Sequence, residues 1–162
     1  MSRLDELTAK IDGFFARVEA RHGDDMQCAT GCSDCCHVRL TITEVEAAAL
    51  RTEIAGWPAA RRAALVANAR ASADRCAALD PAGRCLVYAA RPVVCRSHGV
   101  PIRMRQASLP QVQSCPRNFT HVTPDADCIL DQGTLSALVL AVDRAEGGDG
   151  SRLDLAMLLA TM

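Results

Sequence analysis

Apolar residues recur at helical spacing over the first part of the chain. Between residues 3 and 22, leucine, isoleucine, phenylalanine and valine stand three or four positions apart, and Gly23 follows them. This spacing predicts an amphipathic helix over 3–22 that ends at the glycine. Its buried stripe is expected to consist of Leu4, Leu7, Ile11, Phe14, Phe15 and Val18.

Two more helices are predicted after residue 43. Thr43 and Glu46 have the spacing of a capping box, which begins a helix that reaches about residue 54. Pro58 suits the first turn of a following helix, which we expect to continue to about Leu79. The inward-facing residues of the two helices are expected to be Leu50, Ile54, Leu65, Val66, Ala69, Ala73 and Cys76.

Periodicity is lost in the middle of the chain. Residues 80–83 have the composition of a type I turn. Residues 84–124 contain five prolines, and only 86–88 and 100–104 are expected to form short strands. A poorly periodic stretch of this length is uncommon in a compact domain unless something stabilises it. Metal ligation could do so, because the stretch contains Cys85, Cys95 and Cys115.

Helical spacing returns near the end of the chain. It predicts one helix over 133–146 and another over 151–161. We therefore expect a mainly α fold, namely a compact helical domain with an irregular cysteine-rich insert and one or two short strands. A chain of 162 residues fits a single metal-binding domain, 1–162, whose core is large enough to fold without relying on metal alone.

The sequence CATGCSDCC places four of the nine cysteines within nine residues. A helix would put all four on one face, and a loop with small intervening residues could fold around an ion. A buried helical stripe normally uses aliphatic residues, so core thiols or disulfides are the weaker interpretation. Thiolates this close repel one another unless a cation lies among them, which favours a soft metal or an iron–sulfur cluster. The four residues are Cys28, Cys32, Cys35 and Cys36.

Charge is unevenly distributed, although the formal net charge is only −1. Residues 81–124 contain six arginines and no acidic residue, whereas acidic residues recur from Asp125 onward. Nearby arginines would stabilise a negatively charged thiolate site. The rival interpretation is an anion or nucleic-acid surface. We do not expect nucleic acid as a partner, because the aromatic residues that stack on bases are missing.

The first residues, MSRLDELTAK, are charged and amphipathic, and no apolar run is long enough to span a membrane. We therefore expect no signal peptide, no membrane partner and a cytoplasmic location, where thiols stay reduced. In a reducing compartment, nine cysteines indicate metal ligands before disulfides, and an odd number fits poorly with complete pairing.

A second motif strengthens the metal hypothesis. The segment GRCLVYAARPVVCR has the form G-x-C-x-x-Y-x-x-R-P-x-x-C-R and contains Cys85 and Cys95. Together with C-x-x-x-C-x-x-C-C upstream, it resembles the cysteine-cluster family described as putative zinc- or iron-chelating domains, over about residues 28–119. The resemblance implies cysteine-bound metal but no reaction. By position it implies the ligands Cys28, Cys32, Cys35, Cys36, Cys85 and Cys95, with Cys76 and Cys115 as less direct matches.

The metal itself is left open by the sequence. Eight cysteines could hold two four-thiolate sites or one multinuclear site. Zinc accepts four thiolates from short C-x₂₋₄-C pairs, and iron–sulfur clusters commonly take a tight triplet and a distant fourth cysteine. Cys35 and Cys36 look awkward on one ion, because successive side chains diverge. A radical S-adenosylmethionine enzyme is disfavoured, since the chain is short and lacks repeated βα units.

Several other residues are candidates for supporting roles. His37 and His98 follow motif cysteines closely and could bind metal or donate to a sulfur. Arg91 and Arg96 are expected to contact the sulfurs or order the loop, and Tyr88 to pack with its hydroxyl bonded. We expect His22 and His121 at the surface and Cys128 in the core.

These observations lead to two hypotheses about function. The first is a cysteine-thiolate protein that holds an iron–sulfur cluster or Zn²⁺, whether as a metal-binding protein or as a redox carrier. The second is a zinc-stabilised protein interaction module without catalytic activity, whose partner the sequence does not identify. A thiol-redox protein is a further alternative. No Ser-His-Asp order, phosphate loop or H-E-x-x-H motif is present, and no single thiol stands out as a nucleophile.

Overall fold

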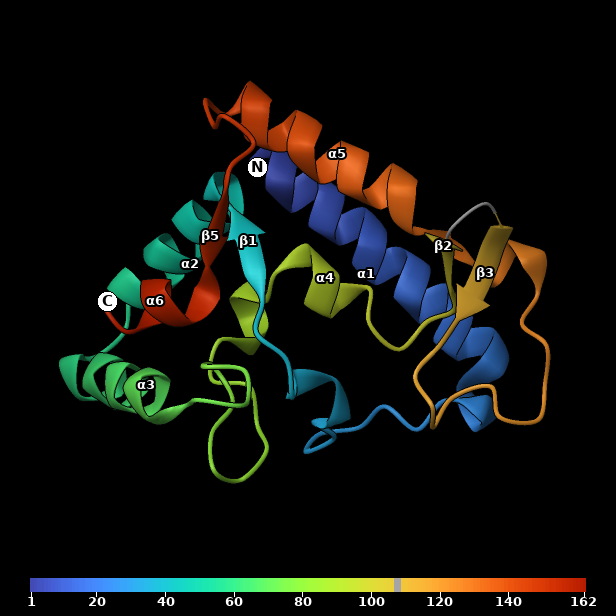
Figure 1. The fold of residues 1–162 in the computed structure, drawn as a ribbon, viewed down its shortest axis with the longest axis horizontal. Helices are drawn as coiled ribbons and strands as arrows, with labels where there is room; N and C mark the ends of the chain where they lie inside the picture. The colour runs from blue at the N-terminus through green and yellow to red at the C-terminus, as the bar shows by residue number, and fades with distance from the viewer. Residues whose placement is uncertain (107–108) are drawn as a thin grey trace. The chain divides into compact units, whose positions relative to one another are not determined.

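The structure is a computed structural model that describes residues 1–106 and 109–162 (Figure 1). It is 51% helical, with six α-helices and short strands in two small sheets, which confirms the predicted mainly α class. The chain forms two compact units. The first consists of 1–29 and 93–142, and the second of 30–92 and 143–162. The expectation that residues 1–162 act as one metal-binding domain stays a prediction.

The first unit is built on helix α1 (Arg3–His22), which has the predicted bounds. Ser2 caps this helix, since its hydroxyl accepts from the amide of Asp5 at 3.1 Å while its own amide donates to the Asp5 carboxylate. The short helix α4 (Val93–Arg96) contacts α1. Helix α5 (Gln132–Ala145) confirms the helix predicted over 133–146.

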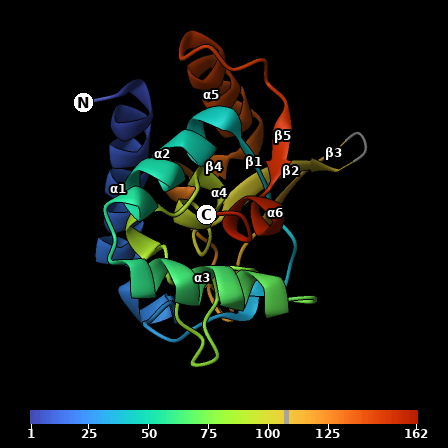
Figure 2. The same cartoon turned by 90° about the vertical axis from the view of Figure 1, so that its left-hand side faces the viewer.

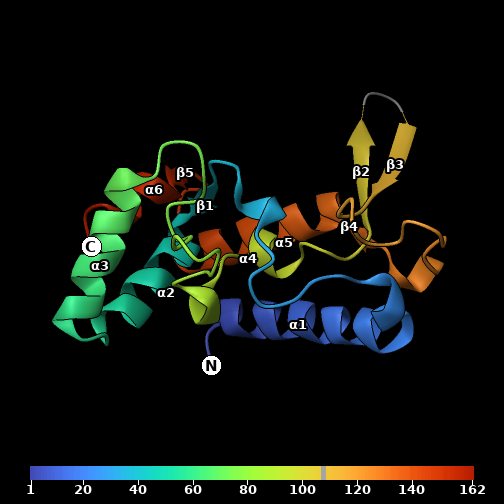
Figure 3. The same cartoon turned by 90° about the horizontal axis from the view of Figure 1, so that it is seen from below.

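A three-stranded sheet completes this unit. Strand β2 (Ile102–Gln106) pairs antiparallel with β3 (Leu109–Gln113), as Figure 3 shows, and parallel with β4 (Leu130–Asp131). The strand expected at 100–104 is therefore confirmed in part. One small core cluster lies beside the sheet and contains Val18, Val100 and Cys128, with Phe14, Phe15, Met26, Ile102, Phe119 and Leu130 packed against it.

The second unit contains strand β1 (Thr41–Thr43), helix α2 (Glu44–Ala55) and helix α3 (Ala59–Ala71). Strand β5 (Arg152–Asp154) pairs antiparallel with β1 (Figure 1), and helix α6 (Leu155–Leu159) packs against α3 (Figure 2). The capping box is confirmed, since the amide of Thr43 donates to the Glu46 carboxylate at 2.9 Å. The core of this unit includes Ile42, Leu50, Ile54, Leu65, Ala69, Cys76, Leu155 and Leu159.

Three boundary predictions are wrong. The helix expected to reach Leu79 ends at Ala71. The chain then folds back on the helix, because the Asn68 side chain donates to the carbonyls of Ala77 and Leu79. Residues 86–88 form turns and the start of a 3₁₀ helix instead of a strand. The last helix begins at Leu155 and not near 151, because 152–154 pair with β1.

Candidate metal centre

The eight cysteines predicted as ligands are divided between the two units. Five of them lie in the second unit: Cys32, Cys35, Cys36, Cys76 and Cys85. Cys28, Cys95 and Cys115 lie in the first.

Cys35 and Cys36 place two thiols close together in the second unit. They belong to a 3₁₀ turn, Asp34–Cys36, in which the amide of Cys36 donates to the carbonyl of Ser33 at 2.8 Å. Their Sγ atoms lie 4.0 Å apart. The expected divergence of these adjacent side chains is not found in this turn, because the two sulfurs lie close together. Whether they share one ion stays a prediction.

A short hairpin carries Cys76 and Cys85. Leu79 and Cys85 form an antiparallel bridge, and the predicted turn between them is confirmed by a 3.0 Å bond from the Gly83 amide to the Asp80 carbonyl. The Asp80 carboxylate also accepts from the amide of Arg84 at 2.8 Å, which holds the turn closed.

Backbone contacts join this hairpin to the upstream cysteine loop. The amide of Cys76 donates to the carbonyl of Cys36 at 2.6 Å. Gly83 has a φ of +76°, and a Cβ atom there would lie 3.3 Å from the carbonyl oxygen of Gly31. The motif glycine is thus needed both for its left-handed backbone and for the approach of the two cysteine segments.

The thiols of the second unit influence one another electrostatically. Burial raises the pKa of the Cys76 thiol, and the nearby Cys35 adds to this effect. Burial also raises the pKa of Cys85, with further contributions from Cys76 and Cys35, whereas Arg91 acts in the opposite direction. These thiols are therefore reluctant to ionise together unless a cation compensates their charge.

In the first unit, Cys28 is surrounded by polar groups from distant segments. The side-chain amide of Asn118 donates to Cys28 Sγ at 3.3 Å and to the carbonyl of Gly99 at 2.8 Å. Its side-chain oxygen accepts from the amide of Gln27 at 2.8 Å. A Cβ atom on Gly99 would lie only 2.8 Å from Cys28 Sγ, so this glycine makes room for the sulfur.

The other two cysteines of this unit are Cys95 and Cys115. Cys115 is buried, and its carbonyl accepts from the Asn118 amide at 2.8 Å. Cys95 lies in α4, where Arg96 forms a 2.6 Å ion pair with Asp12 of α1. Arg96 thus holds α4 on α1, in keeping with the loop-ordering role expected of it.

Other predictions about single residues have mixed outcomes. His37, His98 and His121 are exposed, so the surface position of His121 is confirmed. The prediction that Tyr88 packs inside is wrong, because 63% of it is exposed and its ring lies under the Arg91 guanidinium at 4.1 Å. Cys128 lies in the core as predicted, with 3% of its surface exposed.

The distances between sulfur atoms show how closely the predicted cysteine ligands are gathered. Among residues 1–106 and 109–162, no three of the eight predicted cysteines have all their sulfurs within 4.8 Å of one another.

Sequence reasoning also missed Asn118 as a donor to sulfur, since no motif links it to Cys28.

In the part of the chain that the structure describes, no helix has the length and apolarity to cross a membrane.

The cysteine loops thus give the protein the donor set of a thiolate metal-binding protein. Comparison with known families gives a consistent result: the sequence model of the CxxCxxCC family, described as "Putative zinc- or iron-chelating domain", matches residues 27–116. This match covers more than half of the 162 residues, and the chain belongs to that family. Neither a search of curated proteins nor a search of solved structures found a match.

Proposed function

We propose that the second unit binds zinc through the thiolates of Cys35, Cys36, Cys76 and Cys85. The observation that carries this proposal is the 4.0 Å separation of the Cys35 and Cys36 sulfurs. Around a tetrahedral zinc ion with Zn–S bonds of about 2.3 Å, two sulfurs lie roughly 3.8 Å apart. The adjacent pair therefore already has nearly the spacing that one ion requires.

The remaining two ligands come from the hairpin. Cys76 is joined to Cys36 through the backbone, and Cys85 is placed by the turn that packs on Gly31. Movement of the 31–36 loop and this hairpin toward each other would complete the site. Zinc would displace the thiol protons, and the mutual repulsion that raises the pKa values of Cys76 and Cys85 would give way to attraction toward one cation.

We assign the ion a structural role. Four thiolates would fill the coordination of zinc and leave no position for water or substrate, as is typical of sites that fix a fold. The ion would join the cysteine loop to the hairpin and so present a defined surface, which agrees with a zinc-stabilised interaction module of the cytoplasm.

An iron–sulfur cluster is the second candidate, and one contact favours it. The Asn118 amide donates to the sulfur of Cys28, and hydrogen bonds to cysteine sulfurs are among the features that tune the potential of such clusters. In this alternative, Cys28, Cys95 and Cys115 of the first unit would be cluster ligands.

Elemental analysis of protein purified without oxygen tests the proposal. We expect stoichiometric zinc, no visible colour, and less bound zinc in Cys35→Ser and Cys85→Ser. Ser33→Ala is the matched control, because it alters the same loop without removing a thiol and should retain its zinc. If the protein instead contains iron and acid-labile sulfide in equal amounts and shows brown absorbance, it holds an iron–sulfur cluster and not zinc. Unchanged metal content in both cysteine variants would rule out these thiolate ligands.

A further inference from the structure

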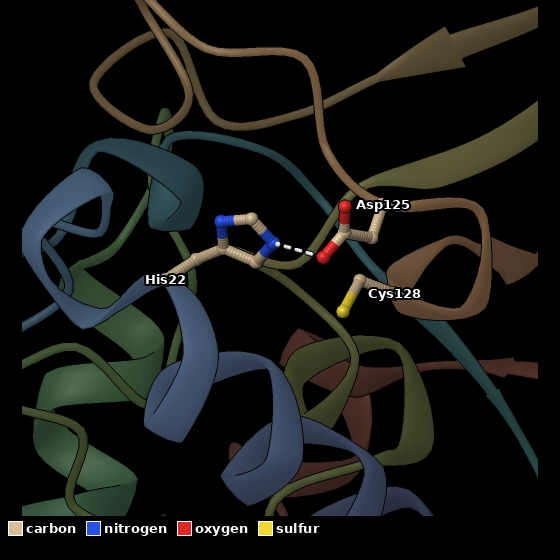
Figure 4. A group of neighbouring side chains, drawn as sticks. All are labelled: His22, Asp125 and Cys128. Atoms are coloured by element: carbon tan, nitrogen blue, oxygen red, sulfur yellow. Dashed lines mark ion pairs between the residues drawn. The ribbon is translucent and has the colours of Figure 1, made fainter.

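A second group of metal-ligand side chains lies in the first unit. The donor atoms of His22, Asp125 and Cys128 all lie within 4.8 Å of one another (Figure 4). His22 is the last residue of α1, whereas Asp125 and Cys128 come from the 3₁₀ turn η4 (Ala126–Cys128) and the residue before it. An imidazole, a carboxylate and a thiol from segments far apart in the sequence therefore converge on one point.

The imidazole of His22 has a carboxylate and an aromatic ring as neighbours. Its Nδ1 lies 3.5 Å from a carboxylate oxygen of Asp25, and its ring meets Phe119 edge-on with the centroids 5.3 Å apart. In metal sites, a carboxylate beside one nitrogen of a bound histidine commonly orients the ring and supports the other nitrogen as a ligand. The prediction that His22 lies at the surface is wrong, because its side chain is only 13% exposed.

The other ring nitrogen of His22 points into the group. Nε2 is buried and has no hydrogen-bond partner among the described residues, although it lies 3.3 Å from a carboxylate oxygen of Asp125. The two atoms are therefore close, but their geometry is not that of a hydrogen bond. A buried polar atom in this state costs free energy, which coordination of a shared ion would recover.

An arginine of α1 contacts the loop that holds Asp125 and Cys128. Its Nη1 atom, on Arg21, lies 3.7 Å from Cys128 Sγ. The same guanidinium makes its shortest contact, 2.7 Å, with Asp127. Arg21 can therefore remain paired with Asp127 while Asp125 and Cys128 turn to a metal ion.

We propose that His22, Asp125 and Cys128 form a second metal site, which takes one zinc-like divalent ion. One nitrogen, one oxygen and one sulfur donor form a borderline set that zinc accepts, and three protein ligands leave a fourth position for water or an exchanging ligand. The Asp125 side chain is 53% exposed, so the ion can reach the site from solvent. All three residues lie outside 27–116, the part matched by the chelating-domain family.

Cadmium-113 NMR of the anaerobic full-length protein tests this site, because the cadmium shift depends strongly on the number of bound sulfurs. We expect one resonance typical of a single thiolate with nitrogen and oxygen donors. It should disappear in His22→Gln, Asp125→Asn and Cys128→Ser. Asp25→Asn should weaken cadmium binding at this site about 10- to 100-fold, because only the support of the imidazole is lost.

Two matched variants distinguish this site from the cysteine motif and from general loop damage. Asp127→Asn changes a carboxylate of the same loop that is not one of the proposed ligands. The single-thiolate resonance should therefore persist in this variant. Cys85→Ser should leave the single-thiolate resonance in place, whatever becomes of the motif site. Asp125→Asn alters a half-exposed side chain and should fold. It can therefore test the site if Cys128→Ser unfolds. The proposal is overturned if the wild-type protein lacks this resonance, or if it survives in folded Asp125→Asn and His22→Gln.

Discussion

The side-chain amide of Asn118 donates a hydrogen bond to Cys28 Sγ across 3.3 Å, although 90 positions separate the two residues in the sequence. Asn118 is only 2% exposed and has each side-chain polar atom bonded, since it also contacts Gln27 and Gly99. The side chain of Asn118 therefore links the sulfur of Cys28 to two backbone groups of other segments.

Replacing Asn118 by aspartate should therefore weaken the first unit. The carboxylate keeps an acceptor for the Gln27 amide but turns an oxygen toward Cys28 Sγ and the Gly99 carbonyl. We expect the free energy of unfolding to fall by about 1–3 kcal/mol. Urea denaturation measures this, with Ser114→Ala as control, since Ser114 contacts only the backbone of Asn118 in this group. Equal stability of the two variants would show that the amide donor contributes little.

The position of Gly99 leads to a second prediction. Its φ is +107°, and a Cβ atom would approach Cys28 Sγ to 2.8 Å, so Gly99→Ala meets both backbone strain and steric overlap. We expect a loss of at least about 1–3 kcal/mol in stability. Gly13→Ala is the matched control, because nothing lies within 4 Å of its Cβ and alanine favours a helix interior by about 1 kcal/mol. In thermal unfolding, the Tm should fall for Gly99→Ala and rise for Gly13→Ala. An unchanged Tm for Gly99→Ala would show that Gly99 is not crowded by Cys28.

Local sequence signals were sufficient for much of the helical structure. The apolar spacing of residues 3–22 and the capping box at Thr43 depend only on neighbours along the chain, and both predictions are confirmed. Predictions were wrong where a distant contact decides the backbone. Asn68 binds two carbonyls beyond the end of its helix, and residues 152–154 become a strand because they meet β1.

The same distinction applies to the sites. Motif spacing was sufficient to find the family, since the short gaps between the cysteines can be read directly from the sequence. The contacts of Asn118 with Cys28, and of His22 with Asp125, join residues that no short motif contains. Cys128 was predicted as a core residue and is one, but its position beside an imidazole and a carboxylate follows only from the folded chain.

The cap of the last helix provides a third prediction, which concerns low pH. The Asp154 carboxylate accepts from the amides of Ala156 and Met157 at 2.8 and 3.0 Å. Hydrogen bonding from the Met157 amide, helped by Arg39, lowers the pKa of Asp154 below its usual 3.8. Stability from this group is therefore present above the unfolded pKa and is lost as the pH falls through the folded one.

Asp154→Ala should lower the free energy of unfolding by about 1 kcal/mol near neutral pH, the usual effect of losing a helix cap. The difference from the wild-type protein should shrink in acid, where the wild-type carboxylate is protonated. Arg39→Ala is the control, since it removes only a largely exposed ion pair, expected to contribute about 0–1 kcal/mol. Denaturation curves for the three proteins across acidic pH check this, and a gap that stays constant with pH would contradict it.

The buried thiol of Cys76 and the partly buried thiol of Cys85 should make the stability of the metal-free protein depend on pH, and bound metal should reverse the direction of that dependence. Burial raises the pKa of each thiol above the usual 9.0. The unfolded chain therefore loses these protons first as the pH rises. The stability that comes from the raised pKa is present below about pH 9 and disappears as the pH climbs through the folded value. Chelator-treated protein should accordingly become less stable from neutral to alkaline pH.

Metal binding should respond in the opposite sense, because a metal takes the thiolate and must displace the proton. Zinc affinity of the apo protein should therefore increase with pH over the same range, and the stability difference between loaded and chelated protein should widen. Competition with a chromophoric chelator at several pH values measures the affinity, and urea unfolding of both forms measures the difference. Cys85→Ser should reduce the number of protons released on binding. A zinc affinity that is independent of pH would mean that these two thiols are not the ligands.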